Sequence, residues 1–105
     1  MAANLTKSTE LVTRRNILAA FAREDLTPHS WSNRPHDRYA AHDHPYHKVL
    51  YCLRGSITFH IEDTATSFEL HPGDCLDIEP QTTHSAIVGP SGVECMEAAQ
   101  LIVES

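Results

Sequence analysis

Residues 49–62, VLYCLRGSITFHIE, carry the most regular pattern in this chain of 105 residues. The first five positions are apolar or aromatic and end at an Arg-Gly step at positions 54–55. After that step Ile57, Phe59 and Ile61 alternate with polar residues, which is the period of a strand with one buried face. The pattern therefore predicts two strands, one over 49–53 and one over 57–61.

The residues that follow continue in the same style, with short extended stretches separated by turn sequences. The two clearest turns are HPGD at 71–74 and GPSG at 89–92, because Gly and Pro favour the backbone angles of tight turns. Short strands at close spacing are typical of an antiparallel all-β barrel or sandwich. The further strands predicted in this way cover 67–70, 75–78, 84–88 and 93–103.

The N-terminal part differs from the rest and predicts one α-helix over about 8–25. Leu11, Leu18, Phe21 and Ala22 fall on one stripe of that helix, and Ser8 is a suitable N-cap. We expect this helix to cover a sheet face or a partner subunit. The predicted organisation is a helical arm over 1–27 followed by a β domain over 28–105.

Composition narrows the function classes. The formal net charge is −6 and no run of Lys or Arg occurs, which disfavours nucleic-acid binding. No apolar stretch is long enough to span a bilayer, and the N-terminus lacks the pattern of a secretory signal. The three cysteines form no C-x-x-C pair and indicate reduced thiols in a cytoplasmic protein. A domain of this size benefits from pairing through a sheet edge, so we expect a homodimer.

Histidine is the residue type that points to chemistry. The chain has eight histidines, and His42, His44 and His47 fall within six residues. Such a local density is typical of metal binding. The sequence therefore predicts a site near these positions.

Two segments around the histidines resemble the two motifs of the cupin family. HDHPYHKVLYCLRG (42–55) resembles the first motif, H-x-H, a short gap, Glu, six residues and Gly. GDCLDIEPQTTH (73–84) resembles the second, in which Gly, Pro and a final His recur at these separations. The resemblance implies a small single-domain cupin of the RmlC-like superfamily. Its fold would be an antiparallel jelly-roll β-barrel, here with one N-terminal helix, and its metal ligands would be His42, His44 and His84.

The geometry of strands is consistent with that ligand set. Residues two apart on a strand point to the same face, so His42 and His44 can both face the interior, where His84 would meet them from another strand. Three imidazoles with an open position suit Zn, Fe, Ni, Mn or Cu as a divalent ion. His47 has the other parity and would be a fourth ligand only if residues 45–46 reset the strand.

The chain departs from the first motif at one chemically important position, because Lys48 stands where the family has glutamate. Three outcomes stay open. The lysine can stay neutral beside the metal as a proton acceptor. It can turn away while water or His47 completes the coordination shell. The third outcome is a site that holds an anionic ligand and no metal.

These observations leave two functions in view. The first is a metal-binding small cupin that acts on or binds a small polar molecule, with the reaction unassigned. The second is a non-catalytic ligand-binding or sensor cupin whose metal site is degenerate. In either case we expect four residues to line the cavity: Lys48, Tyr46, Leu50 and Cys52.

Overall fold

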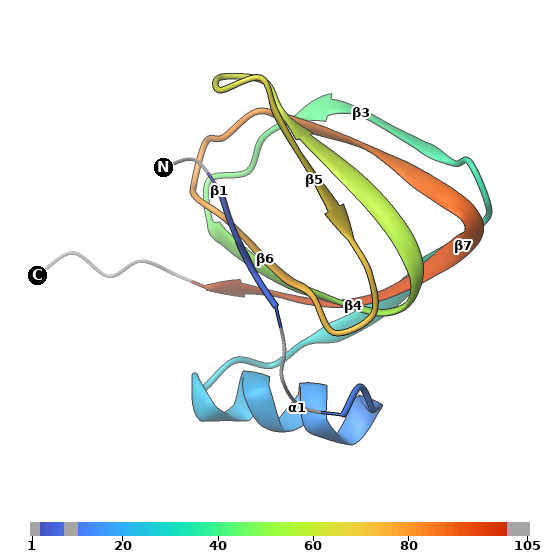
Figure 1. Ribbon diagram of the computed structural model, residues 1–105. Coiled ribbons are helices and arrows are strands. Elements are labelled where there is room, and N and C mark those ends of the chain that lie inside the picture. Colours follow the sequence, from blue (N-terminus) through green and yellow to red (C-terminus); the bar gives the residue numbers. More distant parts are fainter. Residues whose placement is uncertain (1–2, 8–10, 101–105) are drawn as a thin grey trace, which may run out of the picture.

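The computed structural model describes residues 3–7 and 11–100. Within them the chain forms one helix and an antiparallel sheet of seven strands (Figure 1), which confirms the predicted all-β class with a single N-terminal helix. In chain order the elements are β1 (Ala3–Thr6), α1 (Arg14–Arg23), β2 (His29–Asn33), β3 (Arg38–His42), β4 (His47–Ile61), β5 (Thr66–Leu70), β6 (Cys75–Ile78) and β7 (His84–Gln100).

Two long strands, β4 and β7, organise the whole sheet. They pair with each other from the His47↔Gln100 end to the Ile61↔His84 end. The first half of β4 also pairs with β6 and its second half with β5. The first half of β7 pairs with β3 and its second half with β2. The sheet therefore has two parts that share the long strands, and β1 extends one part by pairing with β6.

The two parts meet at a bend, where the sequence pattern had predicted interruptions. Arg54-Gly55 does not end a strand and the segment 89–92 does not form a separating turn, because β4 and β7 run through both. The β4–β7 register shifts between Cys52 and Arg54 and again between Gly55 and Ile57. Gly55 and Gly92 have φ of 78° and 79°, which only glycine adopts without strain. Glycine thus bends these strands and does not terminate them.

Hydrogen bonding does not close the sheet into a ring within the described residues. The pairing path runs β1-β6-β4-β7-β2, and β3 and β5 attach to β7 and β4 beside it. The sheet nevertheless curls round one core (Figure 1), since residues of both parts pack together in a single buried cluster. The fully buried members of that cluster include Leu50, Ile57, Ile61, Leu70, Leu76 and Val88.

Helix α1 covers the outer face of the β4–β6–β7 part. Ile17 and Phe21 are its buried residues, and they pack with Val49, Leu53 and Cys75. The predicted apolar stripe was wrong except for Phe21: Leu11 is 77% exposed and precedes the helix, and Leu18 is 42% exposed. The helix begins later than expected, because the Thr13 hydroxyl caps it by accepting a hydrogen bond from the Asn16 N–H at 3.0 Å.

Several predicted features lie outside these elements. The proposed cap Ser8 and residues 101–103 of the last predicted strand are outside the described residues. Strand β1 was not predicted, because its apolar and polar residues alternate over only four positions, too few to distinguish a strand from a loop. Helix α1, the one helix within residues 3–7 and 11–100, is not long and apolar enough to cross a membrane.

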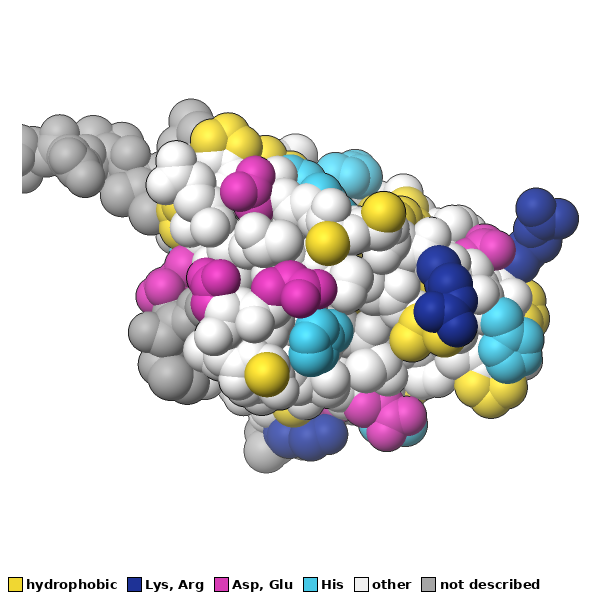
Figure 2. Space-filling model, turned by 90° about the horizontal axis from the view of Figure 1, so that it is seen from above, with side chains coloured by type: hydrophobic (Ala, Val, Ile, Leu, Met, Phe, Trp, Pro, Cys, Tyr) yellow, Lys and Arg dark blue, Asp and Glu magenta, His cyan; other side chains and the backbone are white. Residues whose placement is uncertain are grey.

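Acidic and basic side chains are both present on the face of the molecule shown in Figure 2. On the face shown in Figure 2, carboxylates, histidines and small apolar areas are interspersed, and the Lys and Arg side chains stand apart from one another. This face therefore presents no continuous basic surface.

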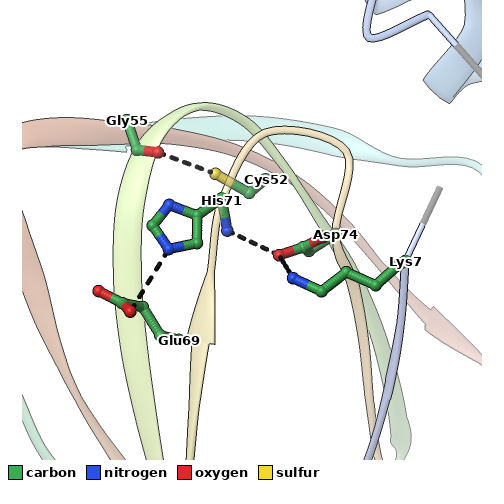
Figure 3. Close-up of polar contacts among 6 residues, drawn as sticks. All are labelled: Lys7, Cys52, Gly55, Glu69, His71 and Asp74. Atoms are coloured by element: carbon green, nitrogen blue, oxygen red, sulfur yellow. Dashed lines mark hydrogen bonds and ion pairs between the residues drawn. The ribbon is translucent and has the colours of Figure 1, made fainter. Parts of the chain in front are cut away.

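The turn at 71–74 is held by one buried carboxylate (Figure 3). Asp74 is 4% exposed and its Oδ2 accepts the backbone N–H of His71 at 2.9 Å and the ammonium of Lys7 at 2.9 Å. Lys7 follows β1, so the contact ties the first strand to the turn before β6. The predicted turn is thereby also an anchor for the N-terminus.

Candidate metal centre

Three histidines come together at one end of the sheet. His42 ends β3 and His84 begins β7, and the two are direct partners across the strands. His44 lies two residues beyond His42, in the connection to β4. Sequence spacing predicted that His42 and His44 share one face. The pairing of β3 with β7 brings His84 beside them.

The rings are close enough to share one ion. Their centroids are separated by 4.5 Å for His42–His84, 4.8 Å for His42–His44 and 5.5 Å for His44–His84. One nitrogen from each ring lies within 4.8 Å of the other two. Two nitrogens bound to one Zn²⁺ can be at most about 4.2 Å apart, so coordination requires a small inward movement of the rings.

Hydrogen bonds define which nitrogen His42 and His84 offer to a ligand. The Nδ1 atoms of His42 and His84 lie 2.8 Å from the carbonyl oxygens of Ala40 and Thr82. A carbonyl only accepts, so each Nδ1 carries the proton and each Nε2 keeps its lone pair. The Nε2 atoms of His44 and His84 are buried and have no hydrogen-bond partner among the described residues. The buried lone pair of His84 Nε2 and the second buried nitrogen without a partner, His44 Nε2, fit a site for a cation.

Burial also favours the neutral form of His44 and His84. His84 is 1% exposed, and desolvation, opposed by the bond to Thr82 and assisted by the charges of His42 and Lys48, lowers its pKa. Desolvation and the charge of Lys48 lower the pKa of His44 as well. Neutral imidazole is the form that binds metals.

Neighbouring aromatic rings fix the orientation of the cluster. Tyr46 stacks on His44 with centroids 4.9 Å apart and planes at 25°, and Phe59 packs at 6.3 Å from His84. Such contacts restrict ring rotation and hold the nitrogens in place.

The histidines form part of the wall of a cavity of about 110 Å³. The wall also contains one ion pair. The Nζ of Lys48 lies 3.4 Å from Glu97 Oε1, and the same oxygen accepts the indole N–H of Trp31 at 2.6 Å. The complete set of lining residues is Trp31, Tyr39, His42, His44, Tyr46, Lys48, Phe59, His84, Ala86 and Glu97.

The structure places the other predicted site residues in three different environments. Lys48 and Tyr46 line the cavity. Leu50 and Cys52 face the same way as Lys48 but are fully buried in the core beyond the cavity wall. His47 lies on the opposite face of β4, where its Nε2 is 3.1 Å from Asp77 Oδ1, and it does not line the cavity. Strand parity accounts for that position, because residues 45–46 do not reset it.

Glu97 is the residue at this site that sequence reasoning left unassigned. It lies on β7 opposite Leu50 of β4 and His29 of β2, so only the strand pairing brings it near Lys48. Trp31 reaches the cavity through the same β2–β7 pairing, opposite Cys95. The sequence feature that could have indicated a role for Glu97 is its position as a carboxylate in the largely apolar predicted strand 93–103.

Comparison with known families agrees with the fold. Residues 29–95 match the family model Cupin_2, described as the cupin domain. The matched segment contains all three histidines and most of the sheet, and the chain belongs to the cupin domain family. No curated protein matched the chain.

Solved structures show the same fold at low sequence identity. A DUF861 family protein from Thermotoga maritima has a TM-score of 0.64 and 14% identity, covering 95% of this chain and 99% of that one. An RmlC-like cupin from Shewanella frigidimarina has a TM-score of 0.63 and 19% identity, over 75% and 68% of the two chains. A structure of DMSP lyases has a TM-score of 0.60 and 19% identity over 71% of this chain, which spans only 37% of that longer one.

Proposed function

We propose that the site binds one divalent transition metal through the Nε2 atoms of His42, His44 and His84, and that the protein uses it to bind or transform a small polar molecule. The observation that supports this most directly is the pair of buried, unpartnered Nε2 atoms on His44 and His84. A polar nitrogen left without a partner in the interior costs about 1–3 kcal/mol, and a cation would remove that cost.

The size of the cavity supports a small ligand. Its volume of about 110 Å³ is well below the roughly 300–1,000 Å³ typical of pockets for drug-sized molecules. Its wall offers the indole N–H of Trp31, the ion pair of Lys48 and Glu97, and apolar surface from Phe59. When bound, the metal would supply Lewis acidity and an open coordination position. The surrounding side chains would orient the ligand and exclude water.

A non-catalytic role as a carrier or sensor is the second candidate, and one observation favours it. In cupins that carry the motif glutamate, position 48 supplies a carboxylate, whereas here Lys48 is held in an ion pair with Glu97. The metal would then have three protein ligands, and the ion pair would shape the ligand space. The two roles differ in turnover, so chemical change of a bound small molecule would separate them.

Metal titration of the full-length protein, purified without a polyhistidine tag, tests the proposal. We expect one equivalent of Co²⁺ or Zn²⁺ to bind by calorimetry, and the affinity to fall at least about tenfold in His44→Ala and His84→Ala. His60→Ala is the matched control, because His60 bonds Ser67 away from the cavity. The proposal fails if the wild type takes up no stoichiometric metal or if the control loses as much affinity as the site variants.

A further inference from the structure

The position of one ammonium group in the cavity wall suggests what kind of molecule the site takes. Lys48 is 8% exposed, and lysine is one of the residue types least often buried. Its side chain enters the same cavity as the three histidines. A buried ammonium needs hydrogen-bond or ion-pair partners to offset the loss of its hydration, and the partners of Lys48 offset that loss only in part.

The compensation comes from Glu97 alone among the described residues. The Nζ–Oε1 distance is 3.4 Å, longer than the 2.7–2.9 Å of a strong charge-assisted bond. The same oxygen accepts the Trp31 indole N–H at 2.6 Å, so Glu97 divides its charge between two donors. An ammonium has three donor hydrogens, and this contact uses one. Lys48 therefore keeps donor capacity on the cavity side.

Charge balance leads to the same conclusion once a metal is present, and this step rests on the proposed function. A divalent ion, the ammonium of Lys48 and the carboxylate of Glu97 sum to +2 with neutral imidazoles. With glutamate in place of Lys48, the same groups would sum to 0. An enclosed site with this excess of positive charge favours an anion over a neutral molecule of equal size.

We propose that the site takes a small carboxylate, which the bound metal and the ammonium of Lys48 in the wall of the same cavity would attract together. A carboxylate carries two oxygens that can bridge two cations. Phe59 and Ala86 in the cavity wall supply apolar surface for a short alkyl group beside it. That surface favours a small organic acid over an inorganic oxyanion. Lys48 is thus a specificity-determining residue, and Glu97 sets how strongly it attracts the ligand.

The test uses the full-length Co²⁺-loaded protein, with acetate and its neutral isostere acetamide as probes. Anion binding is followed by the visible absorption of Co²⁺ and by calorimetry. We expect acetate to bind at least about tenfold more tightly than acetamide, and Lys48→Met to reduce that preference by at least about threefold, because the metal alone still attracts the anion. Lys7→Met is the matched control, because Lys7 is exposed and does not line this cavity.

A second variant tests the same idea in the opposite direction. Glu97→Gln keeps the shape and a hydrogen-bond acceptor for Trp31 but removes the charge that competes with the ligand for Lys48. We expect acetate to bind this variant, fully loaded with Co²⁺, more tightly than the loaded wild type. This outcome is accessible even if Lys48→Met does not fold.

The results separate this inference from the proposed function. Absence of metal uptake by the wild type overturns both. Normal metal uptake with equal affinity for acetate and acetamide overturns the carboxylate proposal alone. So does acetate binding to the loaded Glu97→Gln variant that is no tighter than to the loaded wild type, since the charge of Glu97 would then not compete for Lys48.

Discussion

A single buried carboxylate, Asp74, joins the turn at 71–74 to the N-terminal strand. We expect Asp74→Ala to lower the free energy of unfolding by about 1–3 kcal/mol, because it leaves the His71 N–H without its partner and releases Lys7. Urea denaturation followed by circular dichroism measures this. Asp63→Ala, at an exposed turn position, is the control. Equal stability of the two variants would contradict the assignment.

Residue-scale patterns predicted the histidine cluster but not its surroundings. His42 and His44 are close in sequence, and motif spacing identified His84, so all three could be proposed from the sequence alone. The partner of Lys48 could not, because Glu97 lies on a strand that meets β4 only through the β4–β7 pairing. The same parity argument that placed His42 and His44 on one face correctly disfavoured His47.

At the scale of elements, the bend in β4 and β7 depends on glycine. A Cβ at Gly55 would lie 2.0 Å from the carbonyl oxygen of Gly92, and its φ of +78° is strained for other residues. We expect Gly55→Ala to destabilise the fold by more than about 2 kcal/mol, or to prevent folding.

Gly92→Ala provides the graded comparison for that bend. Its φ is also positive, but the nearest atom, the Asn33 carbonyl oxygen, would be 3.0 Å away. We expect a smaller loss of stability by urea denaturation than for Gly55→Ala. An equal or larger loss would show that the close approach at Gly55 does not determine the bend.

Helix α1 is anchored by Phe21, which is fully buried and packs edge-on against Tyr51 with centroids 5.1 Å apart. We expect Phe21→Ala to cost about 3–5 kcal/mol of unfolding free energy. Leu18→Ala, on the more exposed side of the same helix, should cost far less. Thermal and urea denaturation of both variants test this, and similar losses would argue against the observed helix face.

The predicted elements differ from the observed ones for related physical reasons. Alternation located the buried face of the second half of β4, at Ile57, Phe59 and Ile61, because the side-chain period is local. Gly-Pro and Arg-Gly steps have the composition of turns, yet in β4 and β7 they occupy bulges where neighbouring strands keep the chain extended. The stripe chosen for the helix failed because it began before Thr13, whose cap sets the true start.

At the scale of the whole molecule, the thiols of all three cysteines are buried in the protein interior. Cys52 and Cys95 are fully buried and Cys75 is 6% exposed. Burial, with the nearby charge of Asp77, raises the pKa of Cys75 to about 12, so little thiolate forms at pH 8. We expect almost no reaction with Ellman's reagent in the native protein and three equivalents in denaturant. Thr64→Cys, at an exposed turn, should react rapidly as a control, and a fast native thiol would contradict this arrangement.

The homodimer predicted from chain length stays a prediction. The pairing path leaves β1 and β2 at its two ends within the described residues, so each offers an edge for further pairing. Light scattering at several concentrations gives the mass directly.

The direct pairing of His42 with His84 across β3 and β7 has a consequence for folding as well as for chemistry. An ion bound by both rings would hold the last residue pair of the β3–β7 ladder together. A shift in the register of β3 along β7 would then break the coordination and cost free energy. At a hundredfold excess over its dissociation constant, a ligand of this kind contributes about 2.7 kcal/mol to the native state. Slower amide hydrogen exchange in β3 after metal binding would therefore show that the histidine cluster also fixes the register of β3 against β7.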